Sequence, residues 1–399
     1  MGVYSKKNAR QASEWRQRFG LNANLNRRRF VGLSLAGAIA GVTAGCGDDD
    51  SPSSPLVPLR GTPDGIVPGF TDPDRWVGRT LRVGAWGGEV RDALRQALWQ
   101  PFASATGCEV LEVVTGYGQL KKSTESGEPY ADVVVVDAVW AVANAASGLL
   151  TPIDPGSVDL AVIKLLPVIA NAVPAYAYAM VSAYRWDDLP SEAPETWTAW
   201  WNRERFPGDR SLWKGPLGTF EFALLADGVP PAELYPLDIP RAIERLKAIS
   251  GAIGDHWWES GREPVTWLSQ NRVQFSSAWH HRVVAGQRDA RPIDLVWNQG
   301  LLLVDQWVIP AGAAGADIAL DFLRYASSAQ VQASLARIVP LGPVVGAAYN
   351  FLEPAIAAHL PTAPGTIDLL VPQDVAWWAS HNEEANQLFT SELFEASDG

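Results

Sequence analysis

Cysteine and histidine are scarce in this chain, and their scarcity argues against several classes of protein. The 399 residues include two cysteines and five histidines. Cys46 lies at the end of an apolar run near the N-terminus, which leaves Cys108 as the single cysteine in the rest of the chain. Cys108 therefore has no partner there for a disulfide. There is no Cys cluster and no HExxH motif, and the body has no G-x-S-x-G motif. We therefore expect no structural disulfide, no metal site, no cofactor and no enzymatic activity.

Basic residues are concentrated near the N-terminus and are sparse elsewhere. Residues 1–45 hold eight Lys or Arg and one acid, a net charge of +7. The whole chain carries −12, so the remaining residues carry −19. A nucleic-acid surface needs clustered Lys and Arg to displace counterions, which excludes nucleic acid as an expected partner. An acidic body suits a cationic partner.

Residues 1–45 have the features of an export signal. The paired Arg27 and Arg28 precede an apolar run at residues 31–44 that is too short to remain as a membrane-spanning helix. The arginine pair resembles a twin-arginine signal, although Asn26 replaces the more usual Ser or Thr. We expect export by that route.

The run ends in Thr43-Ala44-Gly45-Cys46, which resembles a bacterial lipobox with Thr43 in place of Leu. Cys46 is then the lipidated first residue, and the alternative is an ordinary cleaved signal with an incidental cysteine. Residues 46–78 are polar and rich in proline, which predicts a flexible tether. The end of this segment, from Arg75 to Val77, is expected to pack on the body.

From residue 80 onward, strands and helices alternate. Strands are predicted at residues 80–86, 109–114 and 131–137, with helices at 89–106 and 118–126 between them. Such alternation indicates a mostly parallel sheet covered by helices, with ligands bound at the carboxyl ends of the strands. Trp86 and Asp137 lie at those ends. The length allows two domains, and no solenoid repeat or coiled-coil heptad is present.

The later part of the chain carries an acid inside an apolar run. Asp305 interrupts residues 297–310, which otherwise have the pattern of a buried strand. An unpaired buried charge costs several kcal/mol, so something must compensate Asp305. An internal Arg or a helix cap is one explanation, and a cationic ligand is the other.

Several short motifs, taken in order, carry a resemblance. They include Trp86-Gly87-Gly88, Ala131-Asp132-Val133, Thr196-Trp197-Thr198-Ala199-Trp200-Trp201, Phe206-Pro207-Gly208, Trp257-Trp258-Glu259-Ser260-Gly261, Ala278-Trp279 and Trp297-Asn298-Gln299-Gly300. Their order and spacing resemble the periplasmic solute-binding proteins of ABC transporters, in the spermidine- and putrescine-binding branch. The resemblance covers residues 80–388.

This resemblance implies an α/β fold with two lobes, the type II periplasmic-binding-protein fold. Each lobe is expected to be a mixed sheet flanked by helices, with the ligand cleft at the hinge. Lobe 1 is expected at residues 79–180 plus 306–352, and lobe 2 at 181–305 plus 353–399. Asp305 then lies where the chain crosses the hinge.

The resemblance also implies the site. Asp305 matches the carboxylate that polyamine-binding members place against an ammonium group, and Trp86 and Trp279 match aromatic walls. Asp137 matches a lining position that is often Ser or Thr in the family, so it is a candidate second acid. Residues 215–218 lack the acids that polyamine binders can carry there, which favours a smaller amine.

We therefore expect a substrate-binding lipoprotein that clamps a small organic cation and delivers it to permease subunits. It is expected to act as a monomer, periplasmic or at the cell surface, held to the membrane by a lipid anchor. A sugar or polyol receptor remains an alternative because Trp also stacks on sugar faces. An exported hydrolase is a further alternative, since carboxylate pairs are recognised only by their distance in space. The adjacent His280 and His281 would point to opposite faces of a strand, where they could not easily bind one metal ion together.

Overall fold

The computed structural model describes residues 67–114, 116–154, 158, 166–187, 189 and 192–395. The expected signal with Arg27 and Arg28, the lipidation site Cys46 and the tether up to residue 66 lie outside the described residues.

The described strands form one mixed sheet in the order β2-β1-β3-β8-β4-β7-β5-β6, with β9 paired to β8. Their bounds are β1 (Thr80–Ala85), β2 (Glu109–Val114), β3 (Val133–Asp137), β4 (Ala172–Arg185), β5 (Arg210–Trp213), β6 (Trp257–Trp258), β7 (Phe275–Trp279), β8 (Ile293–Val308) and β9 (Val371–Pro372). β1 pairs in parallel with β2 and β3, as the βα alternation predicts. β8 runs antiparallel to both β3 and β4, which makes the sheet mixed.

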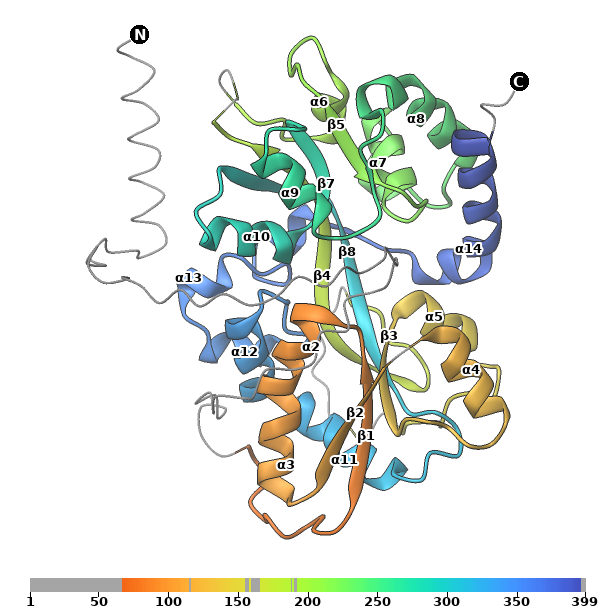
Figure 1. Cartoon of the computed structure of the whole chain (residues 1–399), viewed down its shortest axis with the longest axis vertical. Helices are drawn as coiled ribbons and strands as arrows, with labels where there is room; N and C mark the ends of the chain where they lie inside the picture. Colours follow the sequence, from red (N-terminus) through yellow and green to blue (C-terminus); the bar gives the residue numbers. More distant parts are fainter. Residues whose placement is uncertain are drawn as a thin grey trace, which may run out of the picture. The chain divides into compact units, whose positions relative to one another are not determined.

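Two long strands, β4 and β8, join the two halves of the sheet (Figure 1). β4 and β8 pair with each other from Ala172↔Val308 to Arg185↔Ile293. β3 pairs with one end of β8 and β7 with the other end of β4. Two of the three expected lobe junctions, 180/181 in β4 and 305/306 in β8, fall inside these strands, and the third, 352/353, precedes α13. The exact lobe boundaries stay a prediction.

The stretch that contains Asp305 is the buried strand that the apolar pattern predicts. β8 is longer than expected because Trp297–Gly300 bulge out of the ladder, where Met180 pairs with Leu301 and Ser182 with Val296. Gln299 adopts a φ of 62° in this bulge and accepts a hydrogen bond from the backbone N–H of Trp197 at 3.0 Å. Two apparent strands are therefore one.

Helices pack on both faces of the sheet (Figure 1). Their bounds are α2 (Gly88–Leu94), α3 (Gln100–Thr106), α4 (Tyr117–Glu125), α5 (Ala138–Asn144), α6 (Trp197–Trp201), α7 (Thr219–Ala226), α8 (Ile239–Ile253), α9 (Glu263–Ser269), α10 (His280–Arg288), α11 (Ala316–Ala326), α12 (Ala329–Ile338), α13 (Pro354–Ala357) and α14 (Val375–Thr390). Short 3₁₀ turns occur at Pro231–Glu233, Gly346–Phe351 and Ile367–Leu369, and a π-helical turn at Ser391–Glu395.

The first predicted helix is continuous from Gly88 to Thr106. A π-helical stretch, Arg95–Trp99, connects α2 to α3. Gly107 ends the helix with a φ of 72°, a conformation that glycine adopts without steric cost. A Cβ at this position would also meet the Pro73 carbonyl oxygen at 2.3 Å, so glycine allows the preceding segment to approach.

Four tryptophans around α6 and in α14 are buried. Trp197, Trp200 and Trp378 are at most 1% exposed, and Trp201 is 7% exposed. Trp197 stacks on Phe222 with ring centroids 3.9 Å apart. These rings fill the half of the molecule around α6 and α7.

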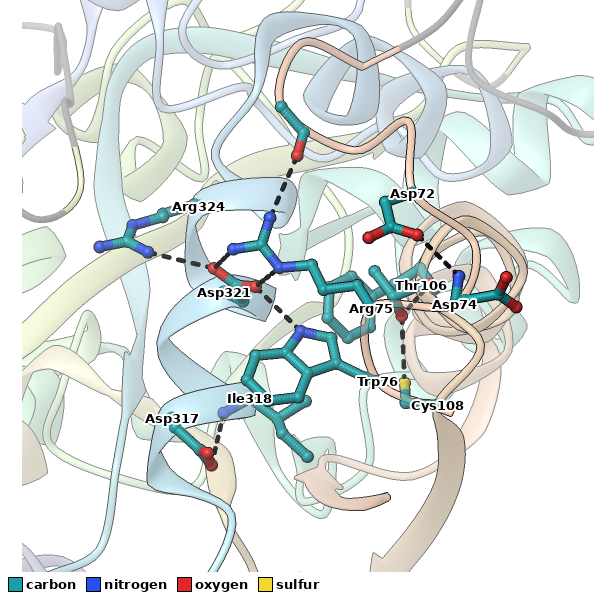
Figure 2. A network of polar contacts seen from close by, with 12 residues as sticks. Asp72, Asp74, Arg75, Trp76, Thr106, Cys108, Asp317, Ile318, Asp321 and Arg324 are labelled. Atoms are coloured by element: carbon teal, nitrogen blue, oxygen red, sulfur yellow. Dashed lines mark hydrogen bonds and ion pairs between the residues drawn. The ribbon is translucent and has the colours of Figure 1, made fainter. Parts of the chain in front are cut away.

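Residues 67–78, the described part of the expected tether, pack against α11. Asp321 is 2% exposed and accepts hydrogen bonds from Trp76 Nε1 and Arg75 Nη2, both at 2.9 Å (Figure 2). Arg324 adds an ion pair at 3.1 Å. The Trp76 backbone N–H donates to the Thr106 carbonyl at 2.7 Å. These contacts compensate the buried carboxylate and fix the chain where it enters β1.

Candidate ligand-binding site

A cavity of about 310 Å³ opens where the carboxyl ends of β1 and β7 approach the middle of β4 and β8. It is lined by Trp86, Gly87, Val90, Tyr176, Tyr178, Gly261, Trp279, His281, Arg282, Asp305 and Leu341. Three of the four residues predicted from the sequence, Trp86, Trp279 and Asp305, therefore share one cavity. Asp137 is not among its lining residues.

Asp305 is the buried acid of this cavity. It is 3% exposed, and its Oδ2 accepts hydrogen bonds from the Tyr176 hydroxyl at 2.8 Å and from Trp86 Nε1 at 3.0 Å. Its Oδ1 has no hydrogen-bond partner within the described part of the chain. Among the described residues, Asp305 forms no ion pair with an arginine either. Neutral hydrogen-bond donors therefore compensate its buried carboxyl group.

Burial raises the pKa of Asp305 to about 7. The hydrogen bond from Tyr176 opposes this increase, whereas the nearby charge of Asp137 adds to it. A cation brought into the cavity would stabilise the ionised form, because opposite charges attract strongly where water is excluded.

Asp137 lies behind Asp305 and has partners of its own. The two residues are directly opposite in the antiparallel β3–β8 ladder. Asp137 Oδ1 caps α5 by accepting from the Trp140 backbone N–H at 2.8 Å, and Oδ2 accepts from the Tyr117 hydroxyl. Both carboxylate oxygens of Asp137 thus accept hydrogen bonds from the protein. This suits an acid that acts on Asp305 through its negative charge and does not contact the ligand.

The two aromatic walls are positioned by other rings. Trp86 follows β1 and packs edge-on against Tyr117 at 5.2 Å between centroids. Trp279 ends β7 and packs edge-on against Tyr178 at 5.5 Å. A Cβ at Gly261 would lie 2.7 Å from Trp279 Cδ1, so any residue other than glycine would displace this indole.

Sequence reasoning missed four polar lining residues. Tyr176 and Tyr178 alternate along β4, and this spacing of two was a usable signal for one face of a strand. His281 and Arg282 were missed because His280–Arg288 is helix α10 rather than a strand. His280 and His281 thus lie on a helix and not on a strand. The residue before the helix, Trp279, makes no side-chain capping hydrogen bond, so no start signal was visible in the sequence.

The two histidines have different environments. His280 is 0% exposed; its Nδ1 accepts from the Ala179 backbone N–H at 3.0 Å and its Nε2 lies 2.6 Å from the Pro340 carbonyl. Burial lowers the pKa of His280 to about 4 and that of His281 well below its ordinary value. His281 Nδ1 is buried without a partner in the described segments. His281 is therefore a neutral polar group available to a ligand.

Arg282 brings a positive charge to the cavity edge. Its Nη1 donates to Glu89 Oε2 at 2.7 Å, which connects α10 to α2. Burial lowers the pKa of Arg282, and the charge of Glu89 counteracts this effect. A guanidinium carries five N–H donors, so the contact with Glu89 leaves others for a second acid.

The described residues carry no signature of a metal site or of a membrane span. Within the described ranges, no group of three His, Cys, Asp or Glu side chains could hold a metal ion. His381 belongs to no such group, and its ring stacks on Trp377 at 4.5 Å between ring centroids. None of the helices in those ranges is long and apolar enough to cross a membrane.

Comparisons with known proteins agree with the fold. The family model of the bacterial extracellular solute-binding proteins matches residues 97–362. A gamma-aminobutyric acid-binding protein of Pseudomonas aeruginosa is 31% identical over 321 residues, 78% of this chain and 90% of the relative.

Two solved structures extend the likeness to three dimensions. An ABC transporter substrate-binding protein from Bradyrhizobium japonicum is 30% identical with a TM-score of 0.75, covering 79% of this chain and 99% of its own. A GABA receptor is also 30% identical, with a TM-score of 0.73 and coverage of 79% and 98%. The expected two-lobe α/β fold is confirmed. The chain therefore belongs to the bacterial extracellular solute-binding proteins, the family of ABC transporter substrate-binding proteins.

Proposed function

We propose that this protein binds a small amine that also carries a carboxylate, and delivers it to the permease of an ABC importer. The observation that carries the proposal is that one cavity is lined by both a buried acid, Asp305, and a guanidinium, Arg282. A ligand with one charge of each sign matches this pair. Gamma-aminobutyric acid, the ligand named for one relative, has this chemistry.

The ammonium end fits the acidic side of the cavity. Asp305 Oδ1 is available as an acceptor, and a charge-assisted bond from an ammonium is stronger than a neutral one. The faces of Trp86 and Trp279 add cation–π attraction of about 0.5–2 kcal/mol per ring. The expected role of these residues as a cation clamp is retained in this proposal.

The carboxylate end fits the side of α10. Arg282 supplies a planar fork of donors, and the neutral His281 supplies a further polar atom nearby. A cavity of about 310 Å³ is at the lower end of the ordinary range for ligand sites, about 300–1,000 Å³. This size favours a short amino acid over a long polyamine, which also lacks a carboxylate for Arg282.

Calorimetry on the purified protein tests this proposal. The panel comprises gamma-aminobutyric acid, putrescine, spermidine, butyrate and glucose. We expect the amino acid to bind at least about tenfold more tightly than putrescine or butyrate, because each of them lacks one of the two charges. Tight binding of glucose without a response to any amine would overturn the proposal and support a sugar receptor.

The two lobes are proposed to close on the ligand about the β4–β8 ribbon. Lobe 1 comprises residues 79–180 plus 306–352, and lobe 2 residues 181–305 plus 353–399. We propose that the protein works as a monomer. Small-angle X-ray scattering with and without gamma-aminobutyric acid tests both points: the expected result is a monomer that becomes more compact with ligand.

The export route and anchor are also proposed. Arg27 and Arg28 direct twin-arginine export, and Cys46 carries a lipid that holds the protein to the membrane. Cys46→Ala should move the protein from the membrane fraction to the soluble fraction. Lys substitution of both arginines should stop export, and unchanged fractionation of either variant would count against its part of the proposal.

A further inference from the structure

A second hollow, of about 390 Å³, is lined by four arginines. Arg262 immediately precedes α9, Arg282 and Arg288 belong to α10, and Arg291 follows that helix. The chain as a whole has more acids than bases, with 44 Asp and Glu against 32 Lys and Arg. Four arginines around one hollow therefore oppose the charge of the rest of the protein.

The acids around this hollow do not balance the arginines. Glu89 and Asp289 also line it. Arg282 pairs with Glu89 at 2.7 Å, and Arg291 lies 3.7 Å from Asp289. Arg262 and Arg288 form no ion pair with any residue that the structure describes. The hollow thus has a formal charge of +2.

The packing of α10 brings these side chains together. A Cβ at Gly286 would lie 2.6 Å from Ile293 Cδ1, 3.1 Å from Val265 Cγ1 and 3.4 Å from Arg291 Cδ. Glycine at this position therefore lets α9 and the stem of Arg291 lie directly against α10. A larger residue would push Arg291 away from the hollow.

We propose that this hollow binds a small multivalent oxyanion, such as a diphosphate or a tricarboxylate, between the four guanidinium groups. Guanidinium forks match phosphate and carboxylate oxygens in geometry as well as in charge. Arg262 and Arg282 line the same hollow, and the charge of Arg262 adds to the effect of burial in lowering the pKa of Arg282. A bound anion replaces this repulsion with attraction.

The site is placed to influence the ligand cavity. Arg282 lines both hollows, and its ion-pair partner Glu89 lines the second one. An anion that draws Arg282 away from Glu89 changes the contact between α2 and α10. By linkage, the anion and the cavity ligand then alter each other's affinity by the same factor. The anion site can be tested in the absence of any cavity ligand, so it does not rest on the function proposed above.

Calorimetry with inorganic pyrophosphate and with citrate, in the absence of any amine, tests the proposal. We expect binding that weakens as salt is added, because exposed charges are screened. The double variant Arg262→Gln and Arg288→Gln should weaken it at least about tenfold. Arg272→Gln, the same change at an exposed arginine outside the hollow, is the matched control and should have no effect.

Two outcomes would overturn the proposal. One is that neither anion binds at concentrations up to about 10 mM, because a specific site would bind at much lower concentrations. The other is anion binding that the double variant leaves unchanged. Thermal unfolding of the variants shows whether they are folded, and Arg262→Lys with Arg288→Lys should restore part of the affinity because it restores the charge.

Discussion

Asp137 and Asp305 lie directly opposite each other in the β3–β8 ladder, so two acids meet at the end of β3. Like charges in facing positions destabilise a sheet. Here each acid has its own donors: the Tyr117 hydroxyl for Asp137, and Tyr176 and Trp86 for Asp305. These neutral donors lessen the repulsion without cancelling the charge, which leaves a net attraction for a cation in the cavity.

Replacing Asp305 tests the ammonium site. Asp305→Asn keeps the shape of the side chain and removes its charge. We expect gamma-aminobutyric acid to bind about thirtyfold more weakly or worse, since loss of a buried charge partner costs about 2–5 kcal/mol. Calorimetry measures this change. An unchanged affinity in a variant that unfolds at the normal temperature would show that Asp305 has a structural role only.

The pH dependence of binding follows from the raised pKa of Asp305. An ammonium ligand binds the ionised carboxylate, and the pKa of about 7 means that this form is scarce at pH 5. Affinity should rise about tenfold per pH unit between about pH 5 and 7 and level off above 7.

The stability of the ligand-free protein should change in the opposite direction. The folded state holds a proton on Asp305 that the unfolded state has already released above its ordinary pKa of 3.8. The contribution of this group to stability therefore falls as pH rises from about 4 to 7. Denaturant unfolding of the protein and of Asp305→Asn isolates this contribution. An amine affinity that is constant from pH 5 to 8 would contradict the raised pKa of Asp305, on which both expectations rest.

Removing the facing charge should shift this pH profile. Asp137→Asn preserves the cap of α5, because asparagine is as good a capping residue as aspartate. Loss of the charge lowers the pKa of Asp305, so the plateau of amine affinity should begin at a lower pH. A pH profile identical to that of the unmodified protein would show that the two carboxyl groups do not interact.

Replacing Arg282 separates the two ends of the ligand. Arg282→Gln should weaken gamma-aminobutyric acid about tenfold or more and leave putrescine unaffected or bound more tightly, because only the amino acid carries a carboxylate. Glu89→Gln is the control: it breaks the ion pair at 2.7 Å and keeps the guanidinium. Equal losses for both ligands in Arg282→Gln would indicate a general effect on the cavity.

The glycine beside Trp279 offers a test of the aromatic wall. Gly261→Ala places a Cβ 2.7 Å from Trp279 Cδ1, so the indole must move. We expect amine affinity to fall several-fold, in line with the loss of about 0.5–2 kcal/mol from one ring face. Gly251→Ala in α8 is the control, since its Cβ meets no atom within 4 Å. Unchanged affinity in Gly261→Ala would mean that Trp279 does not contact the ligand.

Much of the first half of the sheet was predictable from the sequence. β2 occupies the expected residues 109–114, and α2 and α3 together occupy the expected helix from one residue earlier. These elements have strong local signals, namely periodic apolar residues and the glycine stop at 107. α10 was missed because its N-terminus has no capping side chain and its middle contains Val283, Val284 and Gly286, residues that disfavour a helix.

By itself, the sequence determined that the chain is α/β, that Asp305 is a buried acid in need of compensation, and that Trp86 and Trp279 lie at the carboxyl ends of strands. These conclusions rest on local patterns and on the cost of burying a charge. Only the tertiary structure decided which groups compensate Asp305, that Asp137 faces it, and that Arg282 shares its cavity. Tyr176 and Trp86 lie 129 and 219 residues away from Asp305 in the chain, and no local pattern encodes contacts that arise when distant strands pair.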